Sequence, residues 1–297
     1  MGWRTLLITQ PAKLSLLHHS LVLNNGEEYT IPLSDLACVV VESRHVTLTS
    51  PLIDALSYSG AVVFICDEKH LPSSVILPFH AHSRQAGVAR MQVAWSEPFK
   101  KRCWQKIIQA KITNQAKVSE TLSHEQMRYL FSLQNRVTSG DSTNVEAQAA
   151  RVYWSVLFQN FVRHTDAKDI RNAALNYGYA VLRGLVARAL VGVGFLPAFG
   201  VHHCSELNAF NLADDVIEPF RPFVDETVRQ LLDEDKEELP LHLDTRYKTR
   251  LLELPLLPCR IGNVETTLSY ACELCAESLL RATKAKDATL LETASFI

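Results

Sequence analysis

The first 80 or so residues alternate between apolar and polar positions with a period of two, or form short apolar runs. Runs such as LLIT, SLVL, ACVVVE and AVVFIC are typical of β-strands. Between SLVL and EEYTI, Asn24-Asn25-Gly26 predicts a hairpin, since Asn and Gly tolerate positive φ. Ser50-Pro51 predicts a short helix over 50–56, with Ser50 as its N-cap and Pro51 at its first position. We therefore expect a β-rich, mostly antiparallel domain over residues 1–85.

Beyond LPFHAHSRQAG the apolar positions take a helical spacing, and Gly and Pro become scarce within the segments. After a linker at 86–97, the pattern predicts helices at 99–117, 119–137, 142–163, 168–193, 206–232 and 264–285. The sequence therefore predicts an α+β multidomain chain. A small N-terminal β-sheet or β-sandwich domain is followed by a larger all-α domain over residues 98–297.

The amino-acid composition limits the classes of protein to which the chain can belong, and it agrees with the predicted two-domain fold. Of the 297 residues, 47% are hydrophobic and 21% are charged, which suits a globular protein with two cores. The most apolar stretch, 173–200, carries Arg183 and Arg188 near its middle, so we expect a core helix rather than a membrane span. The N-terminus lacks a secretion signal and the seven cysteines form no disulfide framework, so we expect a cytoplasmic protein with free thiols.

Charge is distributed unevenly although the formal net charge is only −2. Residues 84–117 contain eight Lys or Arg and one acid, whereas residues 206–238 contain eleven acids and three basic residues. Such a separation suits a protein that binds a polyanion with one part and a cation with another. Two solvated helix faces of opposite sign explain the same pattern without any ligand.

Glu146 is the first acid to be considered, in SGDSTNVEAQAARVYW. Thr143 and Glu146 match the S/T-x-x-E capping box, in which the glutamate side chain accepts a hydrogen bond from a free backbone amide. The local sequence gives no sign of a catalytic or metal-binding role for this glutamate.

A second group of candidates lies in GVHHCSELNAFNLADDVIEPFRP. His202 and His203 follow a Gly and Pro-rich turn that can aim one imidazole inward, and either can equally be an ordinary surface or core histidine. Glu218 can share a helix face with Asp214 or with Asp215, and like charges this close repel unless a cation compensates them. Pro219 is expected to kink or end the helix beside Glu218, which suits either a site or a corner.

Other chemical signatures are weak or missing. Cys272-Glu-Leu-Cys275 is a C-x-x-C pair without the second pair that a structural zinc needs, so we read it as two helical thiols one turn apart. The sequence contains no P-loop, no G-x-G-x-x-G and no G-x-S-x-G. The usual nucleotide-binding and hydrolase fingerprints are therefore absent.

Longer motifs carry a resemblance to a known family. The segments NAALNYGYAVLRGLVARAL, FLPAFGVHH and NAFNLADDVIEPFRPFVD follow VEAQAARVYW in this order. Together they resemble the CRISPR-associated adaptation integrases, and more narrowly the branch found beside type II RNA-guided effectors. The resemblance covers nearly the whole chain and implies a β domain, a short linker and a helical catalytic domain.

The resemblance also implies a metal site. In the family, a Glu, a His and a second acid bind a divalent cation on the helical domain, and they match Glu146, His203 and Glu218. The position of the family's His relative to the second acid selects His203 over His202. Many relatives have Asp at the second acidic position, but either carboxylate can bind Mg²⁺ or Mn²⁺. His202, Cys204 and Glu206 are expected to be bystanders.

The function that the resemblance implies is insertion of short foreign DNA fragments into a CRISPR array. The 3′-hydroxyl of the fragment attacks a phosphodiester at the repeat boundary, with Mg²⁺ or Mn²⁺ as cofactor. The implied partners are DNA, a second copy of the chain, and a small second adaptation protein whose dimer is flanked by two such homodimers in a heterohexamer. The β domain is expected to support dimerisation and the DNA fragment, and the RNA-guided effector is a further candidate partner.

Residues outside the metal site are assigned more broadly. Phosphate contacts are expected from the basic stretch, namely Arg84, Lys100, Lys101, Arg102 and Lys106. Support around the metal is expected from Asp214, Asp215, Asn172, Asn176 and Tyr177, although helix packing explains the last three equally well. Two rival functions use the same residues: a stand-alone metal nuclease on branched or single-stranded DNA, and a scaffold that bridges DNA without chemistry.

Overall fold

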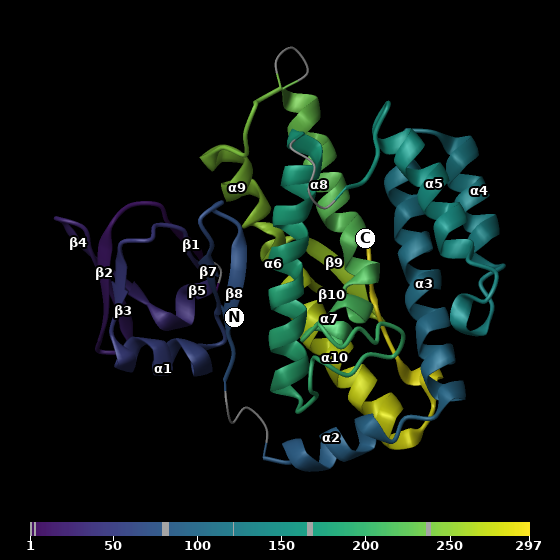
Figure 1. Cartoon of the computed structure of the whole chain (residues 1–297), viewed down its shortest axis with the longest axis horizontal. Coiled ribbons are helices and arrows are strands. Elements are labelled where there is room, and N and C mark those ends of the chain that lie inside the picture. Colours follow the sequence, from purple (N-terminus) through teal and green to yellow (C-terminus); the bar gives the residue numbers. More distant parts are fainter. Residues whose placement is uncertain (1, 3, 79–82, 121, 165–168, 236–238) are drawn as a thin grey trace. The chain divides into compact units, whose positions relative to one another are not determined.

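The structure is a computed structural model that describes residues 2, 4–78, 83–120, 122–164, 169–235 and 239–297. The chain divides into two compact units, Met1–Ala81 and His82–Ile297. The first is rich in strands and the second is mainly helical, so the predicted fold class is confirmed (Figure 1).

The N-terminal unit contains two four-stranded sheets, ordered β1-β5-β7-β8 and β4-β3-β2-β6. Its strands are β1 Arg4–Ile8, β2 Ala12–Leu17, β3 Ser20–Asn24, β4 Glu28–Pro32, β5 Leu36–Val41, β6 Val46–Leu48, β7 Val62–Cys66 and β8 Pro72–Ile76. The predicted hairpin joins β3 to β4, with Gly26 at a φ of 109°. Three pairings, β1 with β5, β5 with β7 and β2 with β6, are parallel, so the expectation of a mostly antiparallel domain is wrong.

One of the parallel pairings, of β5 with β7, is connected through a helix. α1 (Ser50–Ser59) connects β6 to β7 and buries Leu52 and Leu56 in the same core as Leu14, Leu21 and Val39. A crossover of this kind lets β5 and β7 run in the same direction, whereas the chain returns through other strands for the parallel pairs β1 with β5 and β2 with β6. The helix begins one residue earlier than expected, because its N-cap is Thr49 rather than Ser50.

The C-terminal unit contains the predicted helices, most of them with shorter bounds, and two short helices at 85–93 and 245–251 that the sequence did not predict. They are α2 Gln85–Val93, α3 Glu97–Glu120, α4 His124–Gln134, α5 Val145–Leu157, α6 Ile170–Gly192, α7 Asn211–Val216, α8 Arg221–Glu234, α9 Thr245–Leu251 and α10 Leu268–Ala285. The predicted segment 206–232 is broken between α7 and α8 by the 3₁₀ turn η3, Glu218–Phe220. Pro219 lies in that turn, as the sequence predicted.

Two features of this unit differ from expectation. A small antiparallel sheet, ordered β10-β9-β11, lies in the domain expected to be all-α; its strands are β9 Pro258–Ile261, β10 Val264–Thr267 and β11 Ala294–Ser295. Residues 264–267, expected to begin the last helix, form β10. Much of the stretch expected to be a linker, 86–97, is helix α2, because Val88 and Gln92 are buried against the unit.

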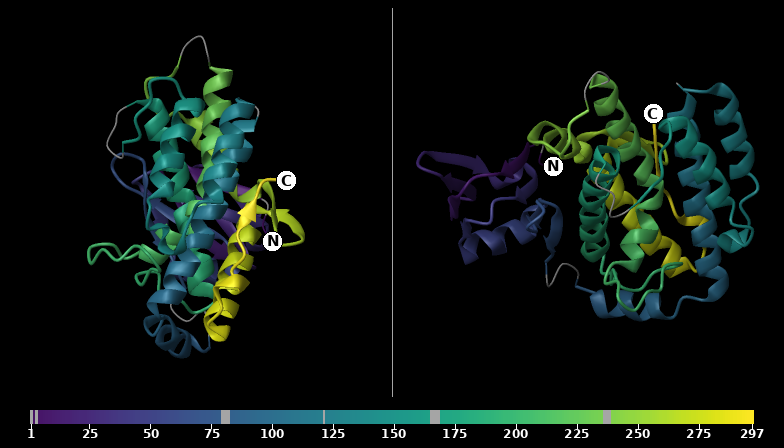
Figure 2. Two further views of the ribbon diagram at one scale, coloured as in Figure 1. Left: turned by 90° about the vertical axis from the view of Figure 1, so that its right-hand side faces the viewer. Right: turned by 45° about the horizontal axis from the view of Figure 1, so that its top comes forward.

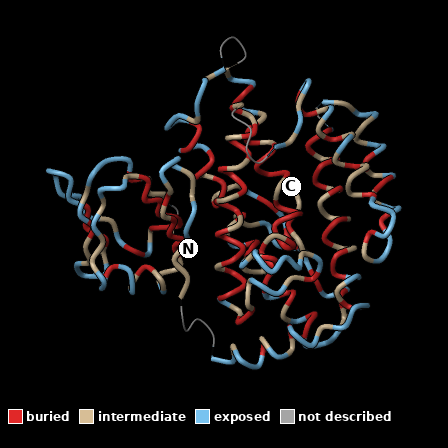
Figure 3. Tube along the Cα trace, in the orientation of Figure 1, coloured by how far each residue is buried: buried red, intermediate tan, exposed pale blue. Residues whose placement is uncertain are grey.

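Close packing of α6 fixes the elements that carry the candidate site. α6 is buried along most of its length (Figure 3) and packs against α8 and α10. A Cβ atom at Gly178 would clash with Val224 of α8, so the glycine permits the close approach of the two helices. The C-terminal segment lies along α3 (Figure 2), where Asn114 Nδ2 donates hydrogen bonds to the carbonyl oxygens of Pro219 (2.7 Å) and Ala294 (2.9 Å).

Candidate metal and nuclease site

Glu146 lies in the first turn of α5 but does not cap it. Asn144 is the N-cap and accepts a hydrogen bond from a backbone N–H of that turn at 3.3 Å. The buried carboxylate of Asp141 accepts two more, from the N–H groups of Val145 (2.8 Å) and Glu146 (3.0 Å). These two residues satisfy the donors that a capping box would satisfy. The predicted capping box of Thr143 and Glu146 is therefore wrong.

Glu218 begins η3 and is buried, with only 6% of its side chain exposed. Its Oε1 lies 2.8 Å from Nε of Arg221, and its Oε2 lies 2.6 Å from Nζ of Lys111. Burial opposes ionisation of this carboxyl, but the charges of Arg221 and Lys111 outweigh it and lower its pKa. Glu218 is therefore an anion.

Lys111 of α3 brings the two acids together. Its Nζ donates to Oε1 of Glu146 at 2.5 Å and also contacts Glu218, and only 12% of the lysine side chain is exposed. Burial acts against the charged amine, but Glu218 and Glu146 more than compensate and raise its pKa. One cation thus lies between two carboxylates that are far apart in the sequence.

Sequence reasoning placed Lys111 only within the basic stretch and missed this role. A signal was present in the helical spacing. Lys111 follows Ile107 and Ile108 and precedes Gln115 on the face of α3 that the structure buries. A lysine among buried positions is rarely left without an anionic partner.

His203 is oriented by Asp215, which is fully buried. The Asp215 carboxylate accepts hydrogen bonds from the backbone N–H groups of Val201 (2.6 Å), His202 (3.1 Å) and His203 (3.0 Å). Its Oδ1 also lies 2.7 Å from Nδ1 of His203. A Cβ atom at Gly200 would clash with both Asp215 and the His203 carbonyl, so this turn requires glycine.

The contact with Asp215 settles which nitrogen of His203 can bind a ligand. With Nδ1 on the carboxylate, Nε2 is the ring atom left for a metal, as in many carboxylate–histidine–metal arrangements. The hydrogen bond to Asp215 raises the pKa of His203, against the effect of partial burial. His202 points elsewhere and stacks on Trp104, with ring centroids 4.0 Å apart.

The two neighbouring aspartates therefore have different environments. Asp215 contacts His203, as expected of a supporting residue. Asp214 instead pairs with Nε of Arg183 at 2.8 Å and accepts a hydrogen bond from Nδ2 of Asn208 at 2.6 Å. Asp214 thus fixes the loop between α6 and α7 and does not contact the candidate ligands.

The asparagines of α6 support an arginine that the sequence did not single out. Asn172 Oδ1 accepts a hydrogen bond from Arg163 at 2.9 Å, and Asn176 Oδ1 accepts one at 2.5 Å. Tyr177 is fully buried in the same helix. The predicted support from Asn172 and Asn176 therefore acts on Arg163, while Tyr177 packs in the core.

Arg163 lines a cavity of about 200 Å³ beside Glu218. Its other lining residues are Lys111, Gln115, Ala150, Trp154, Tyr179, Glu218, Arg221 and Asp225. Asp225 is buried and accepts hydrogen bonds from the hydroxyls of Tyr153 (3.0 Å) and Tyr179, and burial raises its pKa to about 7. The cavity combines three cationic side chains with aromatic walls.

The chemical types of Glu146, His203 and Glu218 suit a divalent cation, but their positions in the structure do not form a complete metal site. Across the described residues, no three His, Cys, Asp or Glu side chains lie close enough together to bind a metal ion. Glu146 and Glu218 nonetheless converge on one position, held by the Lys111 ammonium, and Oε2 of Glu218 is buried without a well-formed hydrogen bond. Two carboxylates and an imidazole are a donor set that Mg²⁺ and Mn²⁺ accept.

Comparison with known proteins gives the family. Residues 6–239 match the family model described as CRISPR associated protein Cas1. The chain belongs to the Cas1 family. A CRISPR-associated endonuclease Cas1 of Neisseria meningitidis serogroup C (strain 8013) is 45% identical over 238 residues, which are 80% of this chain and 78% of that protein.

Solved structures show the same fold. A casposase bound to an integration product has a TM-score of 0.78 at 21% identity, over 96% of this chain and 93% of the other. A chain of a Cas6-RT-Cas1–Cas2 complex has a TM-score of 0.70 at 19% identity, over 98% of this chain and 36% of the other. Cas1 is the integrase of CRISPR adaptation, so nuclease or integrase chemistry follows from the family, which is generally dependent on divalent metals.

Within the Cas1 fold, the basic residues predicted to bind DNA lie outside this cavity. Arg84, Lys101 and Arg102 are exposed, Lys100 pairs with Glu97, and Lys106 Nζ donates to the carbonyl oxygen of Thr289 at 2.6 Å. Arg84 directly precedes α2, and the other four lie on the first half of α3, apart from Lys111. Their contact with DNA stays a prediction.

The remaining sequence signals have structural explanations. Cys272 and Cys275 are buried in α10 and unpaired, and burial raises the pKa of both thiols. His202, Cys204 and Glu206 are exposed. Among the described helices, none is both long and apolar enough to span a membrane.

Proposed function

We propose that this Cas1-family protein is a divalent-metal-dependent DNA integrase that inserts short foreign fragments into a CRISPR array. The observation that supports the proposal is the convergence of Glu146 and Glu218 on one cation position. Both acids are at the positions that the family resemblance assigns to metal ligands, and Nε2 of His203 is available as the third donor.

In the proposed site, Glu146, His203 and Glu218 would hold Mg²⁺ or Mn²⁺ in the place that the Lys111 ammonium occupies between the two carboxylates. When bound, the ion polarises the scissile phosphate and stabilises its added negative charge. Asp215 maintains the orientation of His203, and Arg221 keeps Glu218 ionised. No covalent enzyme intermediate is needed.

The cavity beside Glu218 supplies the remaining electrostatics. Arg163, Arg221 and the displaced Lys111 offer positive charge to phosphate oxygens, and Trp154 and Tyr179 offer aromatic contact to a nucleotide. The 3′-oxygen of the fragment forms a bond to phosphorus as the bond to the target strand's leaving oxygen breaks, and its proton passes to solvent. Positioning and electrostatic stabilisation account for most of the rate in such a reaction.

The proposed partners are DNA, a second copy of the chain and the small adaptation protein Cas2, in a heterohexamer. We assign the β-rich unit to dimerisation and support of the fragment. The exposed cations Arg84, Lys101 and Arg102, with Lys100 and Lys106, are proposed as sequence-neutral phosphate contacts. The segment NAFNLADDVIEPFRPFVD supports placement in the type II branch, which makes the RNA-guided effector a further candidate partner.

A joining assay distinguishes this function from its rivals. A fragment with 3′-hydroxyl ends is incubated with a supercoiled plasmid bearing the repeat, Cas2 and Mg²⁺ or Mn²⁺. Covalent joining that is lost with a 3′-deoxy fragment is expected. Cleavage without joining would indicate a stand-alone nuclease, and binding without any strand breakage would indicate a scaffold.

Single substitutions test the ligands. Glu218→Gln and His203→Ala are expected to abolish joining, because each removes a metal ligand. Glu206→Gln is the matched control for charge, since Glu206 is an exposed acid between them in sequence. If His203→Ala joins fragments at the wild-type rate while His202→Ala does not, the choice of histidine is wrong.

A further inference from the structure

The cavity beside Glu218 contains a polar side chain that the proposed mechanism does not use. Gln115 of α3 lines this cavity and is only 3% exposed. It lies one helical turn after Lys111, so both side chains are on the same face of α3. The cavity therefore combines a neutral amide with the charged groups that surround Glu218.

The amide of Gln115 makes no hydrogen bond within the part of the chain that the structure describes. Its Oε1 is buried without a partner, and no described residue pairs with its Nε2. A buried amide without partners is unfavourable, and native proteins keep few of them. Rotation about the last side-chain bond exchanges the oxygen and the nitrogen, so either group can face the cavity.

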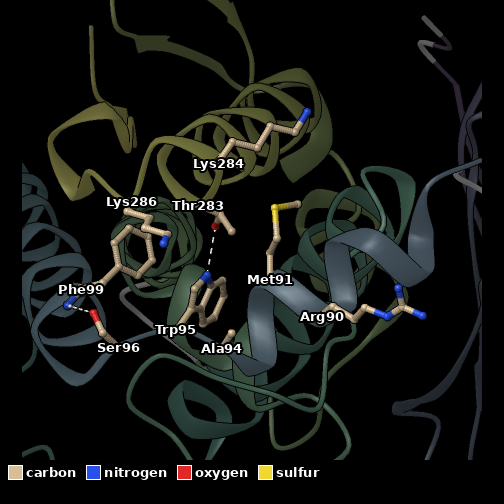
Figure 4. Close-up of a pocket in the computed structure, with 9 residues that line it drawn as sticks. All are labelled: Arg90, Met91, Ala94, Trp95, Ser96, Phe99, Thr283, Lys284 and Lys286. Atoms are coloured by element: carbon tan, nitrogen blue, oxygen red, sulfur yellow. Dashed lines mark hydrogen bonds between the residues drawn. The ribbon is translucent and has the colours of Figure 1, made fainter.

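A second cavity of the helical unit differs in this respect. It has a volume of about 380 Å³ and lies among the end of α2, the start of α3 and the end of α10 (Figure 4). Trp95 Nε1 donates to Oγ1 of Thr283 at 3.2 Å, and Ser96 Oγ accepts a hydrogen bond from the backbone N–H of Phe99 at 3.4 Å. Its uncharged polar side chains are thus engaged, whereas the amide in the cavity beside Glu218 is not.

The charged neighbours of Gln115 are better suited to a phosphate than the amide is. Arg163 and Arg221 line the same cavity, with their guanidinium carbons 5.2 and 4.6 Å from the ring centroid of Tyr179. Guanidinium groups bind phosphate through charge-assisted hydrogen bonds. Phosphate oxygens only accept, so a phosphate would satisfy Nε2 of Gln115 and leave Oε1 unpaired. Gln115 therefore suits a different part of a nucleotide.

The edge of a nucleobase fits the amide. Each unpaired DNA base presents a hydrogen-bond donor next to an acceptor on its Watson–Crick edge. The amide of Gln115 can pair with both groups, and its rotation accommodates either order of donor and acceptor. Trp154, half-buried in the cavity wall, offers its ring for stacking. The cavity volume of about 200 Å³ is below the roughly 300–1,000 Å³ of sites for whole small molecules, so it suits a single base.

We propose that Gln115 contacts the base of the fragment's 3′-terminal nucleotide, whichever base is present. The position of that nucleotide rests on the proposed function, under which its 3′-oxygen lies beside the metal ligands. The base and the 3′-oxygen belong to one sugar, so the base reaches the cavity that Glu218 lines. A contact available to every base suits an enzyme that accepts fragments of unrelated sequence.

Binding of labelled fragments with unpaired 3′ ends to the full-length protein tests this contact. Fluorescence anisotropy in EDTA measures Kd without any chemistry. Wild-type Kd is expected to be similar for the four terminal bases and to rise at least about fivefold when the terminal base is removed, because stacking is lost. Gln115→Met, which keeps the volume, is expected to raise Kd about three- to tenfold for fragments with the base, because hydrogen bonds are lost. It is expected to leave Kd for the abasic fragment unchanged.

Two controls accompany the binding measurement. Gln109 lies two residues before Lys111, on another face of α3 and outside the cavity lining, so Gln109→Met is expected to leave every Kd unchanged. Calorimetry gives the Tm of Gln115→Met. Removal of an unpaired buried amide is expected to keep or raise the Tm. A lower Tm would show that the amide stabilises the fold.

Several outcomes would overturn the proposal. They are absence of fragment binding, equal affinity for intact and abasic fragments, and equal weakening of both by Gln115→Met, which would indicate a contact with phosphate or sugar. The joining assay separates the base contact from the proposed function. Base-dependent binding through Gln115 without any joining refutes only the integrase function, whereas joining with binding that is independent of Gln115 refutes only the base contact.

Discussion

Replacement of Glu146 and of Asp141 separates metal binding from helix capping at the start of α5. In the structure, the side chain of Glu146 contacts Lys111 at 2.5 Å, whereas Asp141 accepts hydrogen bonds from two backbone N–H groups of the first turn. Glu146→Gln keeps a neutral acceptor for Lys111. It therefore replaces an ion pair by a hydrogen bond in which the donor alone is charged, a loss of about 1 kcal/mol.

The expected stability cost of Glu146→Gln is thus about 1 kcal/mol, and the activity cost is larger. Loss of a metal ligand is expected to reduce joining at least ~100-fold, since even outer-shell partners of metal ligands contribute 10–100-fold. Asp141→Ala is expected to destabilise the protein by about 1–2 kcal/mol, as loss of an N-terminal cap does. That lowers the Tm by about 2–8 °C for a unit of this size, while joining at a permissive temperature stays close to wild type.

The assays are differential scanning calorimetry for Tm, the joining assay for activity, and calorimetric titration with Mn²⁺ for metal binding. Glu146→Gln is expected to weaken Mn²⁺ binding with a small change in Tm, and Asp141→Ala to show the reverse. If Glu146→Gln lowers the Tm more than Asp141→Ala and keeps joining activity, then Glu146 is a structural residue and the proposed ligand set is wrong.

Three further predictions concern neighbouring side chains. Asp225→Asn is expected to raise Tm relative to wild type by more at pH 8 than at pH 5.5. The folded pKa of Asp225, about 7, exceeds its unfolded value, so wild-type stability falls as pH rises from about 4 to 7. If burial does not raise this pKa, calorimetry would show the same difference between variant and wild type at both pH values. His202→Phe is expected to keep joining better than His202→Ala, because it keeps the stacking on Trp104; equal rates would contradict this. Lys111→Met is expected to cost about 3 kcal/mol in EDTA, since it breaks a buried ion pair and leaves Glu218 with Arg221 as its one remaining partner of the two. It is also expected to show a larger rise in Tm with Mn²⁺ than wild type; a smaller rise would mean that Lys111 and the metal do not compete.

Much of the fold follows from local sequence patterns. The period-two stretches form the strands of the first unit, Asn24-Asn25-Gly26 forms the hairpin, and Pro219 interrupts the helix where expected. Each of these outcomes depends on steric preferences of a few consecutive residues. The direction of strand pairing was missed, because it depends on the route that the chain takes between two paired strands rather than on any strand's own pattern.

Residues matched to the family motif gave the candidate ligands, and the sequence alone determined that set: Glu146, His203 and Glu218. Their use of metal is a proposal for the experiments above. Residues of the cavity that lie outside the family motif could not be predicted from the sequence. Arg163, for example, follows no motif and reaches the cavity only because Asn172 and Asn176, one helix later, accept its hydrogen bonds.

Only the tertiary structure decided which charges meet. Asp214 and Asp215 are adjacent and chemically alike, but one pairs with Arg183 and the other with His203, because successive residues of a helix point about 100° apart. Lys111 looked like one of many phosphate-binding cations, and packing of α3 against α5 and η3 placed it between two acids instead. Electrostatic energy depends on distance in space and on burial, and neither is fixed by separation along the chain.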